Sequence, residues 1–294
     1  MGRKAVHLFI TGGYDSTFML CKMSRRSLLL QPIYVFNKGR DSREYELGSI
    51  KKILKILSSH PDTKAKIAPI RIIDLDNLKI DSEINAARRS LCKKIGHLGW
   101  QYDYLATIAK DIGMVGVGIE YSPPEGDTGE TEILSNYTRL IPDRLYGFII
   151  DKEASDPAVK TVFEHMFFPI ADITEPEMQN WAKENGYDEV MHSTWFCHSP
   201  IDNLPCGLCP PCEEKMGSKM EHLLPEESKR RYYRAKKCDV FGRRLSRKIK
   251  KLKSGTSKRN TPVTAKNQCF LVGIVFIILL SQCGPHYQHN LNLF

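Results

Sequence analysis

The sequence predicts an α/β fold, an open parallel sheet with helices on both faces, on three observations. Apolar, strand-like runs alternate with helix-like segments over the first 190 residues. A glycine turn joins the first such run to a helix-like segment, and four closely spaced cysteines follow the alternating part. Strands joined by helices lie parallel, and such a sheet binds its ligands at the carboxyl ends of its strands.

The expected elements follow from the spacing of the apolar residues. We expect strands over residues 5–10, 28–36, 68–75 and 114–119, with a short one over 148–150. We expect helices over residues 44–58, 101–112 and 175–185. The last helix stops at Gly186, because glycine readily takes the backbone conformation that ends a helix.

The glycine turn has the residues of an anion site. Gly12 and Gly13 break the first apolar run, and Asp15, Ser16 and Thr17 open the next as residues of the helix-capping kind. A strand, a glycine turn and a helix start aim N–H groups and a positive helix end at one point, which suits a phosphate or pyrophosphate. The Gly-Lys-Ser/Thr ending of a Walker loop is missing. The alternative is an ordinary strand-to-helix turn.

Cys197, Cys206, Cys209 and Cys212 have the spacing of a metal site. Short Cys-x-x-Cys steps bring thiolates together, Gly207 permits the bend, and four thiolates suit tetrahedral zinc in a closed, structural site. From residues 1–10 we expect no signal peptide, and that expectation favours a metal over disulfides. The rivals are unligated thiols and an iron–sulfur cluster, in which the fourth cysteine usually follows the close-spaced three.

Other residues near or like these ligands are expected to be bystanders. His192 and His198 could substitute as ligands, but a histidine beside a complete set of four cysteines is expected to lie outside it. The remaining cysteines lack metal spacing and are expected to pack as small apolar side chains: Cys21, Cys92, Cys238, Cys269 and Cys283.

The positive charge of the chain is concentrated near its C-terminus. The formal net charge is +9, but residues 229–259 hold fifteen Lys or Arg and one acid, a net +14. The rest of the chain therefore carries −5, which argues against nucleic-acid binding over the whole surface. Within this basic segment, apolar residues recur at helical spacing from 241 to 252. A contact with nucleic acid, a membrane surface or an acidic partner competes with a solvated, partly disordered tail.

A short apolar run follows the basic segment, over residues 269–280. Spanning a bilayer takes about twenty residues, so an interfacial or packed segment is favoured over a transmembrane anchor.

Two motifs together resemble a known family. Thr11-Gly12-Gly13-Tyr14-Asp15-Ser16 resembles the Ser-Gly-Gly-x-Asp-Ser loop of the PP-loop ATPases, an adenine nucleotide alpha-hydrolase-like fold. With Thr194-Trp195-Phe196-Cys197 and Cys206-Gly207-Leu208-Cys209-Pro210-Pro211-Cys212, the chain is similar to the 7-cyano-7-deazaguanine synthase (QueC) family. The similarity covers about residues 5 to 220, including Pro169–Met178 and Gly116–Tyr121.

The resemblance implies an ATP-dependent carbon–nitrogen ligase. ATP would adenylate a carboxylate, and ammonia would displace AMP to form an amide, or after a second adenylation a nitrile. The resemblance implies ATP, Mg²⁺ and Zn²⁺, with Asp15 and Ser16 as catalytic residues, although Asp15 could equally be a helix cap. The nucleotide would be bound by Ile10, Thr11, Gly12, Gly13, Tyr14, Asp15, Ser16, Thr17, Phe18, Met19 and Leu20.

The segments that face the substrate depart from the family. Asn37–Ser42 stands where the family has Tyr-Gly-Gln-Arg-His, Leu98–Tyr102 replaces an Arg-Asn pair, and Glu175 replaces a lysine. Three aromatic residues lie in or just after Leu98–Tyr102, and their rings could stack on a planar substrate or pack in the core: Trp100, Tyr102 and Tyr104. Core packing is favoured. We therefore expect a related but not identical acid as the substrate, with 7-carboxy-7-deazaguanine as the first compound to test.

The expected organisation has three parts. Residues 1–190 form the ATP-binding α/β domain, 191–222 a zinc-binding segment packed on it, and 223–294 the basic, partly disordered extension. We expect a cytoplasmic protein, and a second copy of the chain is also a candidate partner. The alternatives are another PP-loop enzyme, transferring sulfur or amidating a nucleic acid or sugar, and a non-catalytic module.

Overall fold

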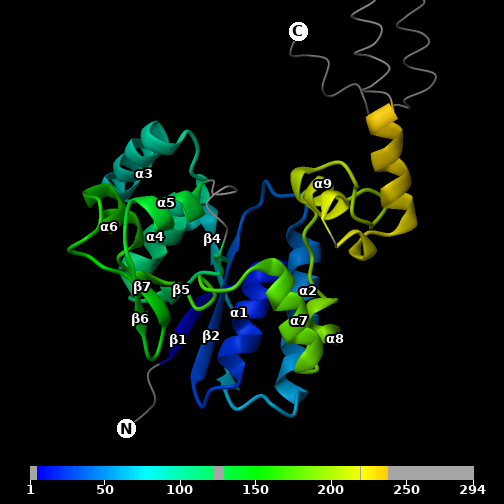
Figure 1. Ribbon diagram of the computed structural model, residues 1–294, viewed down its shortest axis with the longest axis horizontal. Helices are drawn as coiled ribbons and strands as arrows, with labels where there is room; N and C mark the ends of the chain where they lie inside the picture. Colours follow the sequence, from blue (N-terminus) through cyan, green and yellow to red (C-terminus); the bar gives the residue numbers. More distant parts are fainter. Residues whose placement is uncertain (1–4, 122–128, 219, 238–294) are drawn as a thin grey trace, which may run out of the picture. The chain divides into compact units, whose positions relative to one another are not determined.

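The computed structural model describes residues 5–121, 129–218 and 220–237 (Figure 1). Contacts within the chain divide it into two compact units, Met1–His198 and Ser199–Phe294. The two units are described separately below.

The first unit is built on a six-stranded sheet in which every pair of neighbouring strands is parallel. The strands run in the order β3-β2-β1-β5-β8, and β4 also pairs with β2. The strands are β1 (Val6–Phe9), β2 (Leu29–Phe36), β3 (Lys66–Ile67), β4 (Arg71–Asp74), β5 (Val115–Gly116) and β8 (Met166–Phe167). The central strand is β1, which is paired with β2 on one side and β5 on the other.

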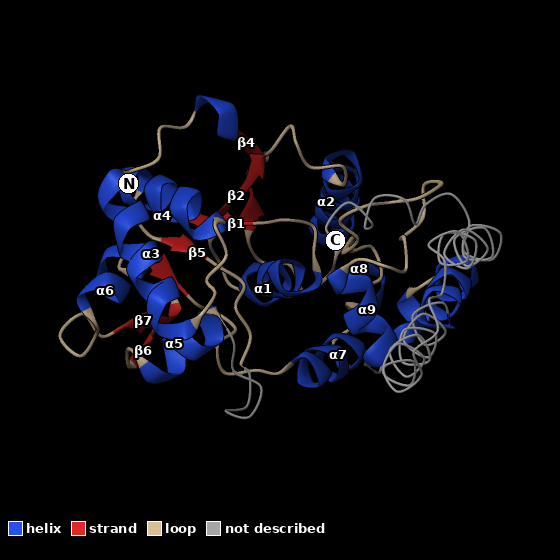
Figure 2. Cartoon of the chain, turned by 90° about the horizontal axis from the view of Figure 1, so that it is seen from above, coloured by secondary structure: helices blue, strands red, loops and turns tan. Residues whose placement is uncertain are grey.

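The helices of the first unit form two groups, one on each face of the sheet (Figures 1 and 2). One group comprises α1 (Tyr14–Ser24), α2 (Arg43–Ser59), α7 (Glu175–Glu184) and α8 (Asp188–Met191). The other comprises α3 (Ser82–Ile95), α4 (Gln101–Ile112), α5 (Glu130–Asn136) and α6 (Pro157–Phe163). The expected parallel sheet with helices on both faces is therefore confirmed.

Apolar side chains hold both layers on the sheet. On one face, Phe9 and Val115 of the strands join a buried cluster with residues of α3, α4, α5 and α6. On the other, Phe18 of α1 is fully buried, and its ring meets the ring of Trp181 of α7 edge-on at 5.2 Å. The core thus fixes β1 and α1, the two elements that flank the glycine turn.

Most expected elements are present, with shifted bounds. The strands expected over 68–75 and 114–119 are reduced to β4 and to the two residues of β5. The strand over 148–150 exists as β7 (Gly147–Ile150), but it pairs antiparallel with β6 (Leu140–Asp143) in a separate sheet. Helix α3 was not expected from the apolar spacing, because only Ile84 and Leu91 of its fourteen residues are buried.

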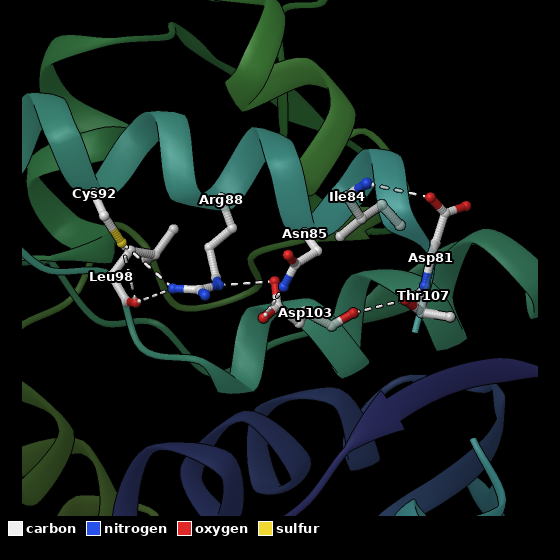
Figure 3. Close-up of polar contacts among 8 residues, drawn as sticks. All are labelled: Asp81, Ile84, Asn85, Arg88, Cys92, Leu98, Asp103 and Thr107. Carbon is white, nitrogen blue, oxygen red and sulfur yellow. Dashed lines mark hydrogen bonds and ion pairs between the residues drawn. The ribbon is translucent and has the colours of Figure 1, made fainter. Parts of the chain in front are cut away.

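A buried polar contact joins α3 to α4 (Figure 3). Arg88 Nε lies 2.7 Å from Asp103 Oδ1, and the two side chains are 14% and 10% exposed. Asn85 donates to the other carboxylate oxygen at 2.9 Å, and Arg88 Nη1 donates to the carbonyl of Leu98 at 3.2 Å. Every oxygen of this carboxylate therefore has a partner inside the protein.

The second unit is short in its described part. It contains α9 (Pro210–Gly217), a 3₁₀ turn (Glu221–Leu223) and a helix over residues 226–237, drawn in orange at the end of the coloured chain in Figure 1. Ser228 is fully buried and donates to the carbonyl of Pro205, which fixes one face of that last helix.

Several expectations fall outside the described residues. These are the helical spacing over 241–252, the apolar run over 269–280, and the packing of Cys238, Cys269 and Cys283. Within the described parts of the chain, none of the helices combines the length and the apolar character needed to cross a membrane.

Candidate functional site

The glycine turn lies at the carboxyl end of β1, directly before α1. Gly12 has φ 75°, a left-handed conformation that favours glycine. A Cβ at this position would lie 3.0 Å from the carbonyl oxygen of Glu46 and 3.2 Å from Ile50 Cγ1. The turn is therefore pressed against α2, and both the conformation and the space require glycine.

Contacts from two other segments fix the peptide that follows Gly12. The carbonyl of Gly12 accepts from the N–H of Trp195 at 2.7 Å and from the hydroxyl of Ser49 at 3.5 Å. The indole of Trp195 stacks on Tyr45 at 4.6 Å and donates to the carbonyl of Cys197 at 2.7 Å. One tryptophan thus links the glycine turn to the first of the four cysteines.

A pair of hydroxyl groups closes the turn. Thr11 Oγ1 and Ser16 Oγ lie 3.1 Å apart, and the N–H of Thr11 donates to Ser16 Oγ at 3.2 Å. The N–H of Gly13 donates to Thr11 Oγ1 at 3.2 Å, and its carbonyl accepts from the N–H of Thr17 at 3.1 Å. These bonds hold the turn in one shape without a ligand, an arrangement expected of a preorganised site.

Helix α1 begins at Tyr14, with Gly13 as its N-cap and no side-chain hydrogen bond at the cap. The expectation that Asp15, Ser16 and Thr17 cap this helix is therefore wrong, because all three lie within its first turn. The carboxylate of Asp15, which is half-buried, is favourably placed beside the positive end of the helix.

The apolar residues of the expected nucleotide stretch belong to the core. Ile10, Phe18, Met19 and Leu20 are at most 3% exposed, and Thr17 is 2% exposed. Their side chains anchor the strand and helix on either side of the turn. Tyr14 is also buried, and burial, with the nearby charge of Glu175 second, raises the pKa of its phenol.

A second glycine segment, after β5, lies against the start of α1. A Cβ on Gly118 would stand 2.9 Å from the backbone nitrogen of Ser16 and 3.0 Å from the carbonyl carbon of Asp15. Only glycine leaves room for that approach. The two segments that follow β1 and β5 therefore meet at the first turn of the helix.

A buried carboxylate that the sequence analysis missed is that of Glu46 on α2, whose backbone carbonyl lies against Gly12. Glu46 is 3% exposed, and its carboxylate accepts from Tyr34 at 2.8 Å and Ser42 at 2.7 Å and lies 3.0 Å from Arg40 Nε. Burial, followed by the charge of Glu46, raises the pKa of Tyr34. The spacing of Ser42 and Glu46, four residues apart on an expected helix, was the available signal.

The three aromatic residues expected to favour core packing behave differently. Tyr102 is buried at 1% exposure, as expected, but Trp100 is 56% exposed, so core packing is wrong for that side chain. The rings of Trp100 and Tyr104 meet edge-on at 5.2 Å. Burial raises the pKa of the Tyr104 phenol, and the positive charge of Arg40 opposes this.

The four cysteines converge as the sequence predicts. The sulfur atoms of Cys197, Cys206, Cys209 and Cys212 all lie within 4.8 Å of one another. The sulfur of Cys212 is 3.9 Å from that of Cys206 and 3.5 Å from that of Cys209. Tetrahedral zinc, with zinc–sulfur bonds of about 2.3 Å, needs sulfur separations of about 3.8 Å. The cluster could therefore hold a metal ion such as zinc.

The backbone around the cluster supports thiolate ligands. The N–H groups of Leu208 and Cys209 donate to Cys206 Sγ at 3.3 and 3.2 Å. Gly207, at φ 78°, makes the bend, and a Cβ there would lie 2.2 Å from the carbonyl oxygen of Ser228. The backbone conformation and the lack of space for a Cβ therefore both require glycine at position 207, which the sequence analysis assigned to the bend.

No histidine joins this group of potential ligands within the described residues. His192 Nδ1 instead lies 2.7 Å from the carbonyl of Asp188, as expected for a bystander. Cys21 is fully buried, which confirms its expected packing, and burial raises the pKa of its thiol. Cys92 is only half-buried and contacts Arg88, so its expected role as an apolar filler is only partly right.

Fold and sites together define a mixed α/β protein with a parallel sheet and a four-cysteine cluster that could bind a metal. Comparisons with protein-family models and with curated proteins found no match for this chain.

Proposed function

We propose that this chain is an ATP-dependent carbon–nitrogen ligase of the 7-cyano-7-deazaguanine synthase (QueC) type. A substrate carboxylate would attack the α-phosphorus of ATP, breaking the bond to the β-phosphate and releasing pyrophosphate. Ammonia would then displace AMP from the acyl adenylate to give an amide. A second adenylation, on the amide oxygen, and loss of AMP would give a nitrile.

The observation that carries this proposal is the position of the glycine turn in the sheet. The chain adds β2 and then β3 and β4 on one side of β1, and later β5 and β8 on the other. The strand order therefore reverses next to β1, and the loops that follow β1 and β5 both start at the carboxyl end of the sheet. Open parallel sheets bind their ligands at such a reversal of strand order.

The turn itself suits the leaving pyrophosphate. The hydroxyls of Thr11 and Ser16 stand beside the positive end of α1, an eleven-residue helix. In the proposed reaction, negative charge grows on the oxygens that leave the α-phosphorus. Fixed donors and a helix end at that point stabilise the transition state more than the ground state, which lowers the barrier.

Asp15 supports a role for Mg²⁺ in the proposed site. A carboxylate in the first turn of α1 would repel a phosphate unless a cation stood between them. Mg²⁺ commonly binds one carboxylate together with phosphate oxygens and water. Asp15 would then hold that ion, directly or through a bound water. The charge of the ion would offset the negative charge of the pyrophosphate.

The four cysteines are assigned a structural role. Four protein ligands leave a tetrahedral zinc ion with no open position for substrate or water. Their connection to the reaction would be mechanical, because Trp195 donates both to the carbonyl of Gly12 and to the carbonyl of Cys197. A metal that fixes Cys197 would thereby help to hold the glycine turn.

For the acid, we propose contacts with Arg40, Tyr104 and Trp100. Arg40 Nε lies 3.0 Å from the carboxylate of Glu46, and the charge of Arg40 lowers the pKa of the Tyr104 phenol against the effect of burial. Trp100, which contacts Tyr104, exposes its ring to a planar ligand. A cation and two aromatic rings would suit a flat aromatic acid, and 7-carboxy-7-deazaguanine is the first compound to test.

The first prediction concerns the products of ATP cleavage. With Mg²⁺, ammonia and 7-carboxy-7-deazaguanine, the purified full chain should convert ATP to AMP and pyrophosphate, and the acid to an amide or nitrile. Chromatography of the nucleotides and mass spectrometry of the acid measure both products. Release of ADP and inorganic phosphate would contradict the proposed cleavage between the α and β phosphates.

The second prediction concerns the hydroxyl of Ser16. Ser16→Ala removes one donor from the turn and should lower kcat by about tenfold or more, with little change in melting temperature. Ser24→Ala, which makes the same change at the other end of α1, is the matched control because the Ser24 hydroxyl donates to the carbonyl of Cys21, outside the glycine turn. Equal kcat values in the two variants would remove Ser16 from the reaction.

A further inference from the structure

The helix over residues 226–237 carries a row of cations around one tyrosine on its exposed side. Arg230, Tyr233, Arg234 and Lys237 are all exposed, and Tyr233 is 51% exposed. Their spacing of three, four and seven residues places them on a single face of the helix. We call these four residues the basic stripe.

Other side chains of this helix make hydrogen bonds and ion pairs within the second unit. Arg231 donates to the carbonyl of Pro205 at 3.4 Å and pairs with Asp202 at 3.3 Å. Lys229 pairs with Glu226 at 2.9 Å. By contrast, none of the ion pairs in the described part of the chain engages a cation of the basic stripe.

The tyrosine of the stripe is held in place but not covered. Its ring meets the ring of Tyr232 at 5.4 Å and 75°, so the two rings are not stacked face to face. Tyr232 is itself half-buried, and Lys236 Nζ lies 5.2 Å from the centre of its ring. Tyr233 is therefore a supported aromatic surface between cations.

This combination points to one class of partner. Single-stranded nucleic acid offers phosphates to cations and unstacked bases to an aromatic ring. A membrane-surface helix would instead present Leu, Phe or Trp beside its cations, and the stripe has none. The charge of the chain agrees, because residues 229–259 carry +14 while the rest carries −5.

We propose that the basic stripe binds single-stranded nucleic acid, with Tyr233 stacking on a base and the three cations contacting the phosphates around it. The proposal stands independently of the ligase reaction. It requires only the helix, its exposed face and the chemistry of four side chains.

The test is fluorescence anisotropy of the full chain with a labelled oligouridylate or oligothymidylate of about twelve nucleotides, over about 50 to 300 mM salt. We expect both oligonucleotides to bind. Replacing Arg230, Arg234 and Lys237 together by glutamine should weaken binding at least about tenfold and lower the salt slope by about two. Tyr233→Ala should weaken binding about tenfold with an unchanged slope, and Tyr233→Trp should restore it.

The matched control neutralises three cations of the basic segment outside the stripe, by Lys250→Gln, Lys251→Gln and Lys253→Gln. A smaller loss in this control than in the stripe variant supports the proposal. An equal loss, together with unchanged binding by Tyr233→Ala, would overturn it, because the interaction would then be general electrostatic attraction. The proposal would also be overturned if the variant with three glutamines in the stripe lost binding to phosphatidylserine vesicles but still bound the oligonucleotides as the wild type does. Circular dichroism checks that each variant is folded.

Discussion

Replacing Cys206 by serine is expected to release the metal and to unfold the segment around the four cysteines. Structural zinc contributes apparent binding free energies of about 10–16 kcal/mol in zinc-finger peptides, which is comparable to the whole stability of a typical domain. Cys206 is buried, and its sulfur also accepts two backbone N–H groups. Its loss therefore removes a ligand and disturbs the bend at Gly207.

Elemental analysis of the gel-filtered chain should find one zinc ion in the wild type and none in Cys206→Ser. Limited trypsin digestion should then cut the second unit rapidly, since its helix over 226–237 is rich in lysine and arginine. Cys92→Ser is the matched control, because this half-buried cysteine lies outside the cluster. A wild type without metal, or iron with a visible absorption band, would contradict the zinc assignment.

Truncating Asp103 to alanine is expected to be among the most damaging single changes in the first unit. It would leave the guanidinium of Arg88 buried without its partner, and breaking a buried pair in this way costs about 3–5 kcal/mol. For a unit of this size, each kcal/mol lowers the melting temperature by about 2–4 °C, so we expect a fall of roughly 10 °C. Thermal unfolding followed by circular dichroism measures it.

Two further variants separate the buried charge from other effects. Asp172→Ala removes an exposed partner of Lys22, with side chains 36% and 50% exposed, and should cost less than about 1 kcal/mol. The double variant Arg88→Met with Asp103→Leu replaces both charges by apolar groups and should recover most of the loss. If Asp103→Ala melts like Asp172→Ala, the contact between α3 and α4 does not carry the stability we assign to it.

The two sites differ in how far neighbouring residues in the sequence determine them. The four cysteines are close in the sequence, so their spacing alone limits which sulfurs can meet, and all four do. The glycine turn was also located correctly, because glycine pairs and apolar runs are local signals. The start of α1 was not predicted correctly, because its N-cap residue is Gly13 and no side chain forms a capping hydrogen bond there.

Polar and mixed segments were harder to predict from apolar spacing. Helix α3 buries only Ile84 and Leu91, although its ends carry ordinary signals. The side chain of Asp81 accepts from two N–H groups at its start, and Gly96 ends it at φ 82°. The prediction of core packing was wrong for Trp100, which is 56% exposed. A large apolar ring is usually favoured in the core, but its exposure depends on which residues pack nearby.

By itself, the sequence determined the alternation of strands and helices, the glycine turn at the end of the first strand and the set of four cysteines. These depend on residue type and on neighbours a few positions away. Only the tertiary structure decided that β1 lies between β2 and β5, that Gly118 meets the first turn of α1, and that the backbone carbonyl of Glu46 lies against Gly12. The physical reason is that apolar periodicity reports whether a side chain is buried, whereas strand order and close backbone approach depend on partners far away in the sequence.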